Sequence, residues 1–281
     1  MTVFSCRKFL EEQLASVAGD CAQVEAEQVL MAALDCSRSF LYAHAEQVID
    51  ETCWRTIEGL VSRRKQGEPL QYILGTAPFM GLEFVVRPGV LIPRRDTEIL
   101  VEHALPYCGG KRVLDLCTGS GCIGISVACL GHPSSVALSD ISLEALNVAG
   151  ANARKHCVAP TIYQGDFLQA IPDGVVFDVI LSNPPYITAE EMDILPFDVR
   201  NFEPHLALAA GDDGLDAYRR ILKDISRVLV RDGYLFFEIG YAQGRAVSSL
   251  MEQAGFKEVQ VLRDYGGQDR VVFGRLMKYL E

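Results

Sequence analysis

From about residue 111 onward, short apolar runs rich in β-branched residues alternate with longer stretches of helical periodicity, and this alternation limits the possible folds most strongly. Neighbouring parallel strands need a crossover of a dozen or more residues, which an α-helix usually supplies. The alternation therefore predicts an α/β fold, with a mostly parallel sheet covered by helices on both faces. The last two runs have no clear helix between them, which indicates a hairpin and one antiparallel edge strand. The runs expected to form strands are residues 112–116, 136–140, 161–164, 177–182, 234–239, 258–262 and 270–276.

The first part of the chain follows a different pattern. Apolar residues recur at helical spacing through residues 1–72, and they predict a small N-terminal all-helical domain with an ordinary apolar core. Residues 73–95 are expected to form a β-hairpin linker. The arms of this hairpin are predicted at residues 69–75 and 79–86, because both segments contain glycines that can form turns. Residues 96–281 are expected to form the second, larger domain.

Composition and charge narrow the possible partners. The net charge of −11 over 281 residues argues against a protein that binds nucleic acid through its phosphates, so we expect a small-molecule or protein substrate. The sequence contains no apolar run of membrane-spanning length, and its first residues lack the order of a signal peptide. Nine cysteines without a C-x-x-C pair indicate reduced thiols in a cytoplasmic protein. Neither the cysteines nor the five histidines cluster at the spacing of metal ligands.

The predicted strand at residues 177–182 runs directly into Asn183-Pro184-Pro185-Tyr186. Proline lacks the N–H that a central strand needs, so the chain must leave the sheet at Asn183. These residues are therefore expected at the carboxyl edge of the sheet, where open α/β folds bind ligands. An uncharged amide, a rigid diproline and an aromatic ring suit the binding of a planar amide or amidine NH2 group. An isolated Asn-Pro pair is more often an ordinary turn, so this interpretation depends on a second motif upstream.

The second motif follows the first predicted strand of the larger domain. Gly119, Gly121 and Gly124 match the pattern G-x-G-x-x-G, and Asp140 ends the next strand near the spacing of a ribose-binding carboxylate. The glycines allow a tight turn and close approach of a ligand, and the carboxylate can accept hydrogen bonds from both ribose hydroxyls. Taken alone, this pattern favours NAD or FAD.

Three further features favour S-adenosylmethionine over a dinucleotide. Asp115, just before the glycine loop, can pair with the ammonium group of a methionine moiety, whereas it would repel a pyrophosphate. Asp166 and Phe167 follow the third predicted strand and can bind the amino group of adenine and stack on its ring. Asn183 follows the fourth strand, across the point where strand order is expected to reverse. The residues expected to bind the cofactor are Asp115, Cys117, Thr118, Gly119, Ser120, Gly121, Asp140, Asp166, Phe167 and Asn183.

In this combination the residues resemble the class I S-adenosylmethionine-dependent methyltransferases, which have a Rossmann-like sheet. More narrowly, they resemble the release-factor glutamine methyltransferases, the family called PrmC or HemK, over essentially the whole chain. The sequence departs from the family pattern at Arg95, where relatives usually have proline, and at Phe167, where they often have tryptophan. The motifs that carry the resemblance are PLQYILG at 69–75, IPRRDTE at 92–98, DLCTGSG at 115–121, NPPY at 183–186, FEP at 202–204 and DRV at 269–271.

The resemblance implies a reaction and roles for individual residues. The family transfers a methyl group from S-adenosyl-L-methionine to the side-chain nitrogen (N5) of the glutamine in the Gly-Gly-Gln motif of peptide chain release factors, which leaves S-adenosyl-L-homocysteine. The helical domain would help to bind the release factor, and a monomer is expected. Asn183, Pro184 and Tyr186 are the expected catalytic residues, and together with Pro185 they form the expected substrate-binding site.

We hypothesise that catalysis depends on hydrogen-bond acceptors rather than on a base. The side-chain oxygen of Asn183 and the carbonyl of Pro184 would accept hydrogen bonds from the two amide hydrogens, while Tyr186 packs against the amide plane. Three alternatives remain open. Methylation of an exocyclic adenine amine would use the same four residues on a flipped base, but the acidic charge opposes it. A non-catalytic S-adenosylmethionine-binding module and an NAD oxidoreductase are the other two.

Overall fold

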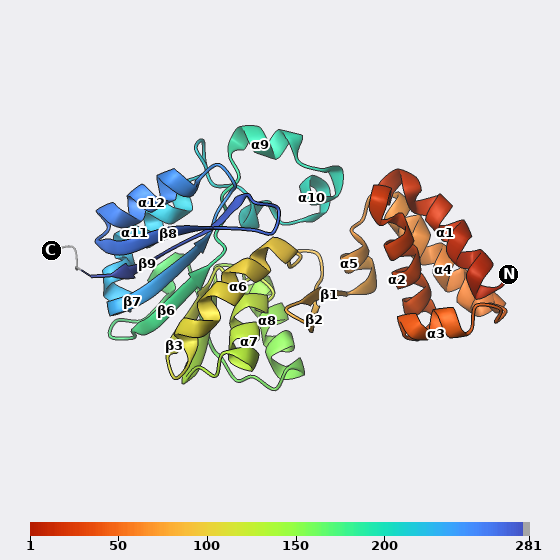
Figure 1. The fold of residues 1–281 in the computed structure, drawn as a ribbon, viewed down its shortest axis with the longest axis horizontal. Helices are drawn as coiled ribbons and strands as arrows, with labels where there is room; N and C mark the ends of the chain where they lie inside the picture. Colours follow the sequence, from red (N-terminus) through yellow and green to blue (C-terminus); the bar gives the residue numbers. More distant parts are fainter. Residues whose placement is uncertain (278–281) are drawn as a thin grey trace. The chain divides into compact units, whose positions relative to one another are not determined.

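The computed structural model describes residues 1–277, which form two compact units. One unit comprises Met1–Gly75 together with Pro196–Phe202, and the other comprises Thr76–Leu195 and the chain from Glu203 onward. Figure 1 shows both units and labels most of their helices and strands. Within residues 1–277, no helix combines the length and the apolar character that crossing a bilayer requires.

The N-terminal unit consists of helices, which confirms the small helical domain expected from the sequence. Several of its helices begin at a side chain that accepts a hydrogen bond from the first turn, namely Thr2, Ser37 and Asp50. Leu14 and Leu30 are fully buried in its apolar core. The helices are α1 (Val3–Ala18), α2 (Ala22–Leu34), α3 (Arg38–Ala43), α4 (Glu51–Lys65), α5 (Leu70–Leu74) and, from much later in the chain, α10 (Phe197–Phe202).

The prediction of a hairpin arm at residues 69–75 is wrong, because this segment forms helix α5. Pro69 precedes the helix, and Gly75 ends it with a left-handed backbone (φ 76°). Leu70 and Ile73, three residues apart, are both buried. Burial of these two residues in the core of the helical unit therefore outweighed the turn signal of the glycines. The hairpin follows the helix as β1 (Thr76–Phe79) and β2 (Leu82–Val85), which pair antiparallel.

A seven-stranded sheet lies at the centre of the larger unit, in the order β5-β4-β3-β6-β7-β9-β8 within the described residues. Strands β3 to β7 run parallel, whereas β9 runs antiparallel to both of its neighbours. The predicted mostly parallel sheet with an antiparallel edge is thus confirmed, and the antiparallel strand lies one position in from the edge strand β8. The strands are β3 (Arg112–Leu116), β4 (Ser135–Asp140), β5 (Thr161–Gln164), β6 (Phe177–Ser182), β7 (Leu229–Glu238), β8 (Phe256–Arg263) and β9 (Asp269–Leu276).

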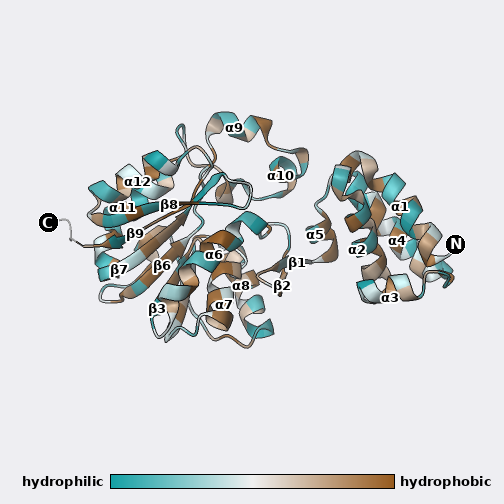
Figure 2. Cartoon of the chain, viewed as in Figure 1, coloured by the Kyte–Doolittle hydropathy of each residue, from teal (hydrophilic) through white to brown (hydrophobic). Residues whose placement is uncertain are grey.

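Helices cover both faces of this sheet (Figure 1). Successive residues of β3 show the two layers, because Val113 joins one apolar core and Leu114 joins the other. Figure 2 shows the apolar strands between the helices, whose outer surfaces are more polar. Helices α6 (Arg95–Cys108), α7 (Cys122–Leu130) and α8 (Leu143–Lys155) pack on one face, and α11 (Asp216–Val228) and α12 (Gly244–Gln253) pack on the other.

The strand order places a crevice at the middle of the sheet. Strand β3 pairs with β4 on one side and with β6 on the other, so the order reverses at β3, and such a reversal opens a ligand site at the carboxyl ends. The long segment after β6 comes back to the carboxyl edge of the sheet. Its amide at Ile187 donates to Leu208 O, and the amide of Ala210 donates to Ile187 O, both at 2.9 Å. The segment contains α9 (Ala189–Ile194), α10 and a short 3-10 helix at His205–Ala207.

Candidate active site

A cavity of about 500 Å³ opens at the carboxyl ends of the central strands. Its volume lies in the range of sites for small molecules and cofactors. Besides the strand ends, the cavity is lined by parts of two other segments, residues 89–94 and 204–211. Of the predicted site residues, those that line the cavity are Cys117, Thr118, Gly119, Ser120, Asp140, Asp166, Phe167, Asn183 and Pro185. Those that do not line it are Asp115, Gly121, Pro184 and Tyr186.

The glycine loop between β3 and α7 forms one wall. Gly121 precedes the first turn of α7 with a left-handed backbone (φ 82°). Gly124 lies in α7 against the sheet, where an added Cβ would be 2.9 Å from the Cβ of Asp115 and would overlap Leu138. The first glycine therefore serves the turn, and the second lets the helix pack closely on the strands.

Asp140 ends β4 and holds the glycine loop. Its Oδ2 accepts a hydrogen bond from the amide of Gly119 at 2.9 Å, and its Oδ1 accepts one from the amide of Ser142 at 2.9 Å. Burial raises the pKa of this carboxyl, although the backbone hydrogen bonds oppose the shift. Each carboxylate oxygen has a second lone pair, so Asp140 can still accept hydrogen bonds from ribose hydroxyls.

Asp115 lies at the base of the loop, fully buried. Its Oδ2 accepts hydrogen bonds from Thr118 Oγ1 at 2.5 Å and from the amide of Gly124 at 2.8 Å. Its Oδ1 is buried without a hydrogen-bond partner among the described residues. Burial raises the pKa of this carboxyl to about 7. Asp115 therefore fixes the shape of the loop and retains one free acceptor atom.

Asp166 and Phe167 follow β5 and meet a residue that the sequence interpretation missed. Arg220 of α11 forms an ion pair with Asp166, and its guanidinium lies over the Phe167 ring at 4.7 Å from the centroid. All three residues line the cavity. The arginine thus orders the two side chains that were expected to contact adenine. A lone arginine on a predicted amphipathic helix carries no sequence signal for such a role.

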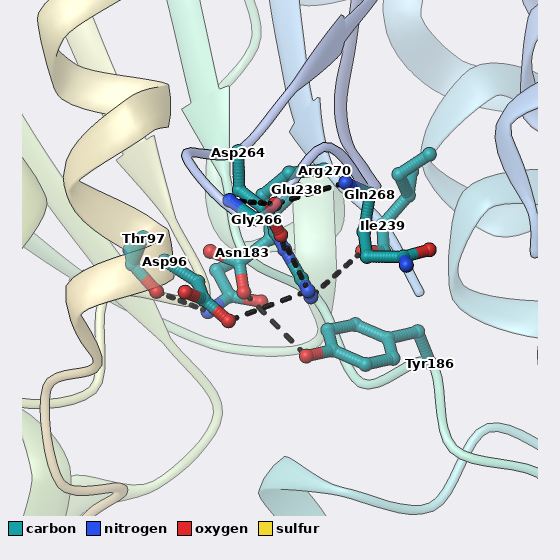
Figure 3. Close-up of polar contacts among 10 residues, drawn as sticks. All are labelled: Asp96, Thr97, Asn183, Tyr186, Glu238, Ile239, Asp264, Gly266, Gln268 and Arg270. Atoms are coloured by element: carbon teal, nitrogen blue, oxygen red, sulfur yellow. Dashed lines mark hydrogen bonds and ion pairs between the residues drawn. The ribbon is translucent and has the colours of Figure 1, made fainter. Parts of the chain in front are cut away.

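Asn183 directly follows the last residue of β6, as predicted, and it lines the cavity, whereas Tyr186 does not. Asn183 Nδ2 donates a hydrogen bond to Thr97 Oγ1 at 3.4 Å (Figure 3). The Tyr186 hydroxyl points to Glu238 and donates to its Oε1 at 3.5 Å. Burial raises the pKa of the tyrosine hydroxyl well above its usual range. In this structure the tyrosine hydroxyl is therefore hydrogen-bonded to Glu238, and the residue does not line the cavity in which the substrate would bind.

Two further segments complete the site. Glu203, at the start of the returning chain, accepts hydrogen bonds from the Arg94 guanidinium and from the amide of Ile92 at 3.4 Å. The segments that hold these residues were predicted only as motifs of a resembling family, without roles. The fold brings them together at the cavity.

These observations define the class of protein. A doubly wound sheet, a glycine loop with an acidic residue after the next strand, and Asn183 at the end of β6 together form the site of a class I methyltransferase. Residues 83–195 match the family described as methyltransferase small domain, and residues 6–75 match the PrmC N-terminal domain. The fold is similar to that of a methyltransferase from Pyrococcus furiosus, with a TM-score of 0.58 at 15% identity, over 77% of this chain and 100% of that one.

Comparison with curated relatives then gives the family. The chain is 40% identical to the release factor glutamine methyltransferase of Geobacter sulfurreducens, over 98% of each chain. It is also 40% identical to the protein of that description from Bacillus subtilis, over 99% of each chain. The chain belongs to the release factor glutamine methyltransferase family.

Proposed function

We propose that this protein methylates the side-chain amide nitrogen of the glutamine in the Gly-Gly-Gln motif of peptide chain release factors, with S-adenosyl-L-methionine as methyl donor. The observation that carries the proposal is the place of Asn183. In a chain that matches its relatives almost from end to end, its amide lies in the wall of the cavity, beside the glycine loop.

The residues around the cavity fit this cofactor. Asp140 offers lone pairs to the ribose, Phe167 offers a ring to adenine, and the buried Oδ1 of Asp115 is an acceptor without a partner among residues 1–277. When bound, S-adenosylmethionine supplies an electrophilic methyl group on a sulfonium. It also carries an ammonium group, which suits an acidic site better than a pyrophosphate does.

The chain's own contribution is to orient a weak nucleophile. An amide nitrogen reacts poorly because its lone pair is delocalised. The side-chain oxygen of Asn183 accepts a hydrogen bond from one amide hydrogen, and the backbone carbonyl of Pro184, which lies between the cavity-lining Asn183 and Pro185, accepts one from the other. These two bonds align the nitrogen and favour the positive charge that develops on it. Loss of one such acceptor should raise the barrier by about 2.7–4 kcal/mol, by analogy with an oxyanion-hole donor. No residue has to remove a proton from the amide first.

We assign different roles to the two units. The sheet unit contains the cavity, and the helical unit, Met1–Gly75 with Pro196–Phe202, has an apolar core of its own. We assign the helical unit to recognition of the release factor and residues 73–95 to the link between the units. The net charge of −11 favours a protein partner over nucleic acid.

One incubation tests the proposal. Purified protein is mixed with radiolabelled S-adenosylmethionine and either a release factor or duplex DNA. We expect label on the release factor alone, and we expect it to disappear when the glutamine of its Gly-Gly-Gln motif is changed. Label on DNA alone would replace the substrate with an adenine amine, and label on neither would leave a binding module.

A further inference from the structure

Helix α11 holds the turn after β5, residues 166–171, near both of its ends. Arg220 and Arg227 are separated by about two helical turns, so they lie on the same face of α11. Arg220 forms an ion pair with Asp166 at the start of the turn. Arg227 donates a hydrogen bond to the backbone carbonyl of Ile171 at 2.8 Å, at the end of the turn. The position of this turn is therefore set by contacts from one face of one helix.

The backbone of Phe167 explains why the turn needs such support. Its φ of 46° lies in the left-handed region, which a bulky residue rarely adopts because its Cβ crowds the following carbonyl. Such a conformation persists only where the surrounding structure fixes it. The guanidinium of Arg220 lies over one face of the Phe167 ring, 4.7 Å from its centroid, and the ring still lines the cavity. The arginine thus supports the ring in a conformation that the turn would not keep alone.

The same guanidinium fixes the carboxylate of Asp166. The ion pair uses the Oδ2 atom, so Oδ1 keeps its lone pairs for a donor in the cavity. A carboxylate held in one place accepts a hydrogen bond from an amino group of a base and repels a carbonyl at the same position. Adenine and hypoxanthine differ in this way, because the exocyclic amino group of the first is a carbonyl in the second. A fixed Asp166 can therefore distinguish the two bases.

We propose that Arg220 is a positioning residue that determines the base specificity of the cofactor site. It holds Asp166 as the acceptor for the exocyclic amino group of adenine and keeps the Phe167 ring beside it. Asp216 and Ala217, at the start of the same helix, also line the cavity, so α11 forms part of the wall at this end. This role rests on the proposed function, because it requires adenine to bind at Asp166 and Phe167.

Two ligands that differ only in the base test this role by calorimetry. One is S-adenosylhomocysteine, and the other is S-inosylhomocysteine, in which hypoxanthine replaces adenine. We expect the wild-type protein to prefer the adenine ligand about 10- to 100-fold, the effect of one hydrogen bond to a charged group. Arg220→Gln should weaken binding of the adenine ligand and lower this preference about tenfold, because a freed Asp166 can turn to the ring N–H of hypoxanthine.

Arg219→Gln is the matched control. It removes the same charge from the neighbouring position of α11, where the arginine pairs with the exposed Asp213 instead of the turn. We expect wild-type affinities and the wild-type preference. The side chains of Arg220 and Asp166 are 52% and 36% exposed, so their ion pair contributes little to stability. The thermal unfolding midpoint of Arg220→Gln should therefore stay close to that of the wild type.

A double-mutant cycle shows whether Arg220 acts through Asp166. The side-chain amide of Asp166→Asn can offer an NH2 group to the carbonyl of hypoxanthine, so this change alone should remove the preference for adenine. Adding Arg220→Gln should then alter the ratio of the two affinities no further. A further change of the ratio in this background would mean that Arg220 acts independently of Asp166, and the inference would be wrong.

Two results from Arg220→Gln alone would also overturn the inference. An unchanged preference, with or without an equal loss of affinity for both ligands, would leave the arginine a purely structural role. Tighter binding of the adenine ligand would mean that the guanidinium competes with adenine for the ring and the carboxylate. The proposed function fails separately. Because no release factor is present, a wrong substrate leaves these titrations unchanged, whereas a wild-type protein that binds neither ligand contradicts the proposed cofactor and the inference with it.

Discussion

The carboxylate of Glu203 and the guanidinium of Arg94 form an ion pair between residues 109 positions apart in the chain. The glutamate side chain is 1% exposed, and it also accepts a hydrogen bond from the amide of Ile92. Two segments that line the cavity are thereby tied to each other. This contact gives a physical reason for the presence of both the IPRR and the FEP motifs in one sequence.

Removing the charge of Glu203 should therefore loosen the cavity wall. We expect Glu203→Gln to lower the free energy of unfolding by about 1–2 kcal/mol. The effect is below that of a fully buried pair because the Arg94 side chain remains 41% exposed. Urea denaturation measures it. Glu51→Gln breaks an exposed pair with Arg55 in α4 and should change the stability little. Equal effects of the two variants would contradict the structural role of Glu203.

Because α7 packs closely on the sheet at Gly124, we expect a larger side chain at this position to destabilise the protein. Gly124→Ala should destabilise the protein by about 1–3 kcal/mol, because the new methyl group meets Asp115 and Leu138. The matched control is Gly59→Ala in α4, where an added Cβ meets nothing within 4 Å. It should stabilise the protein by about 0.5–1 kcal/mol, as alanine does in a helix. Thermal unfolding of the two variants should therefore move in opposite directions, and a shift in the same direction would argue against this packing.

The ring of Phe167 should contribute to cofactor affinity. Phe167→Ala is expected to weaken the binding of S-adenosylmethionine about 10- to 100-fold, the range for one stacked base, as measured by calorimetry. Phe167→Trp should bind at least as tightly, because the larger ring stacks equally well. Phe40→Ala removes a ring that stacks on His44 in the N-terminal unit and should leave the affinity unchanged. An unaffected Phe167→Ala protein would place the adenine elsewhere.

The predictions from sequence were accurate where a local pattern determines the structure. The strand ends followed from apolar runs closed by glycine or proline, so Gly119, Asp140 and Asn183 could be assigned to one edge of the sheet before the structure was known. The hairpin arm at residues 69–75 was wrong, because burial of Leu70 and Ile73 against other helices is a tertiary effect. For the same reason Arg220 could not be predicted, since its position depends on how α11 packs.

The direction of Tyr186 shows a second limit. Its place after the diproline was predictable, but its contact with Glu238 requires the end of β7 to lie beside that of β6, which only the strand order provides. Likewise, the hydrogen bond between Thr97 in α6 and Asn183 after β6 joins residues 86 positions apart in the chain. Long-range pairing of buried polar groups leaves no periodic trace in a sequence.

Two buried carboxyls should make the stability of the protein depend on pH. Burial raises the pKa of Asp115 from 3.8 to about 7 and that of Glu238 from 4.5 to about 7. Both groups bind protons more tightly in the folded state than in the unfolded chain. Stability that is present below about pH 4 is therefore lost as the pH rises toward 7, by roughly 2–3 kcal/mol for each group.

Denaturation at pH 5 and at pH 7.5 tests the direction of this pH dependence of stability. We expect a larger free energy of unfolding at the lower pH. The difference should shrink in Glu238→Gln, whose side chain does not titrate. Glu27 does not interfere, because its pKa is lowered to about 2 and its contribution is already complete at pH 5. A protein that becomes more stable between pH 5 and 7.5 would mean that both carboxyls are ionised throughout.

The most direct measurement is to locate the transferred methyl group by mass spectrometry of a release factor after incubation with this protein and S-adenosylmethionine. We predict one methyl group on the side-chain amide nitrogen of the Gly-Gly-Gln glutamine, and a slower reaction with Asn183→Ala by about 10²–10³-fold. A methyl group on another residue, or an Asn183→Ala protein that reacts at the wild-type rate, would contradict the assignment of this site.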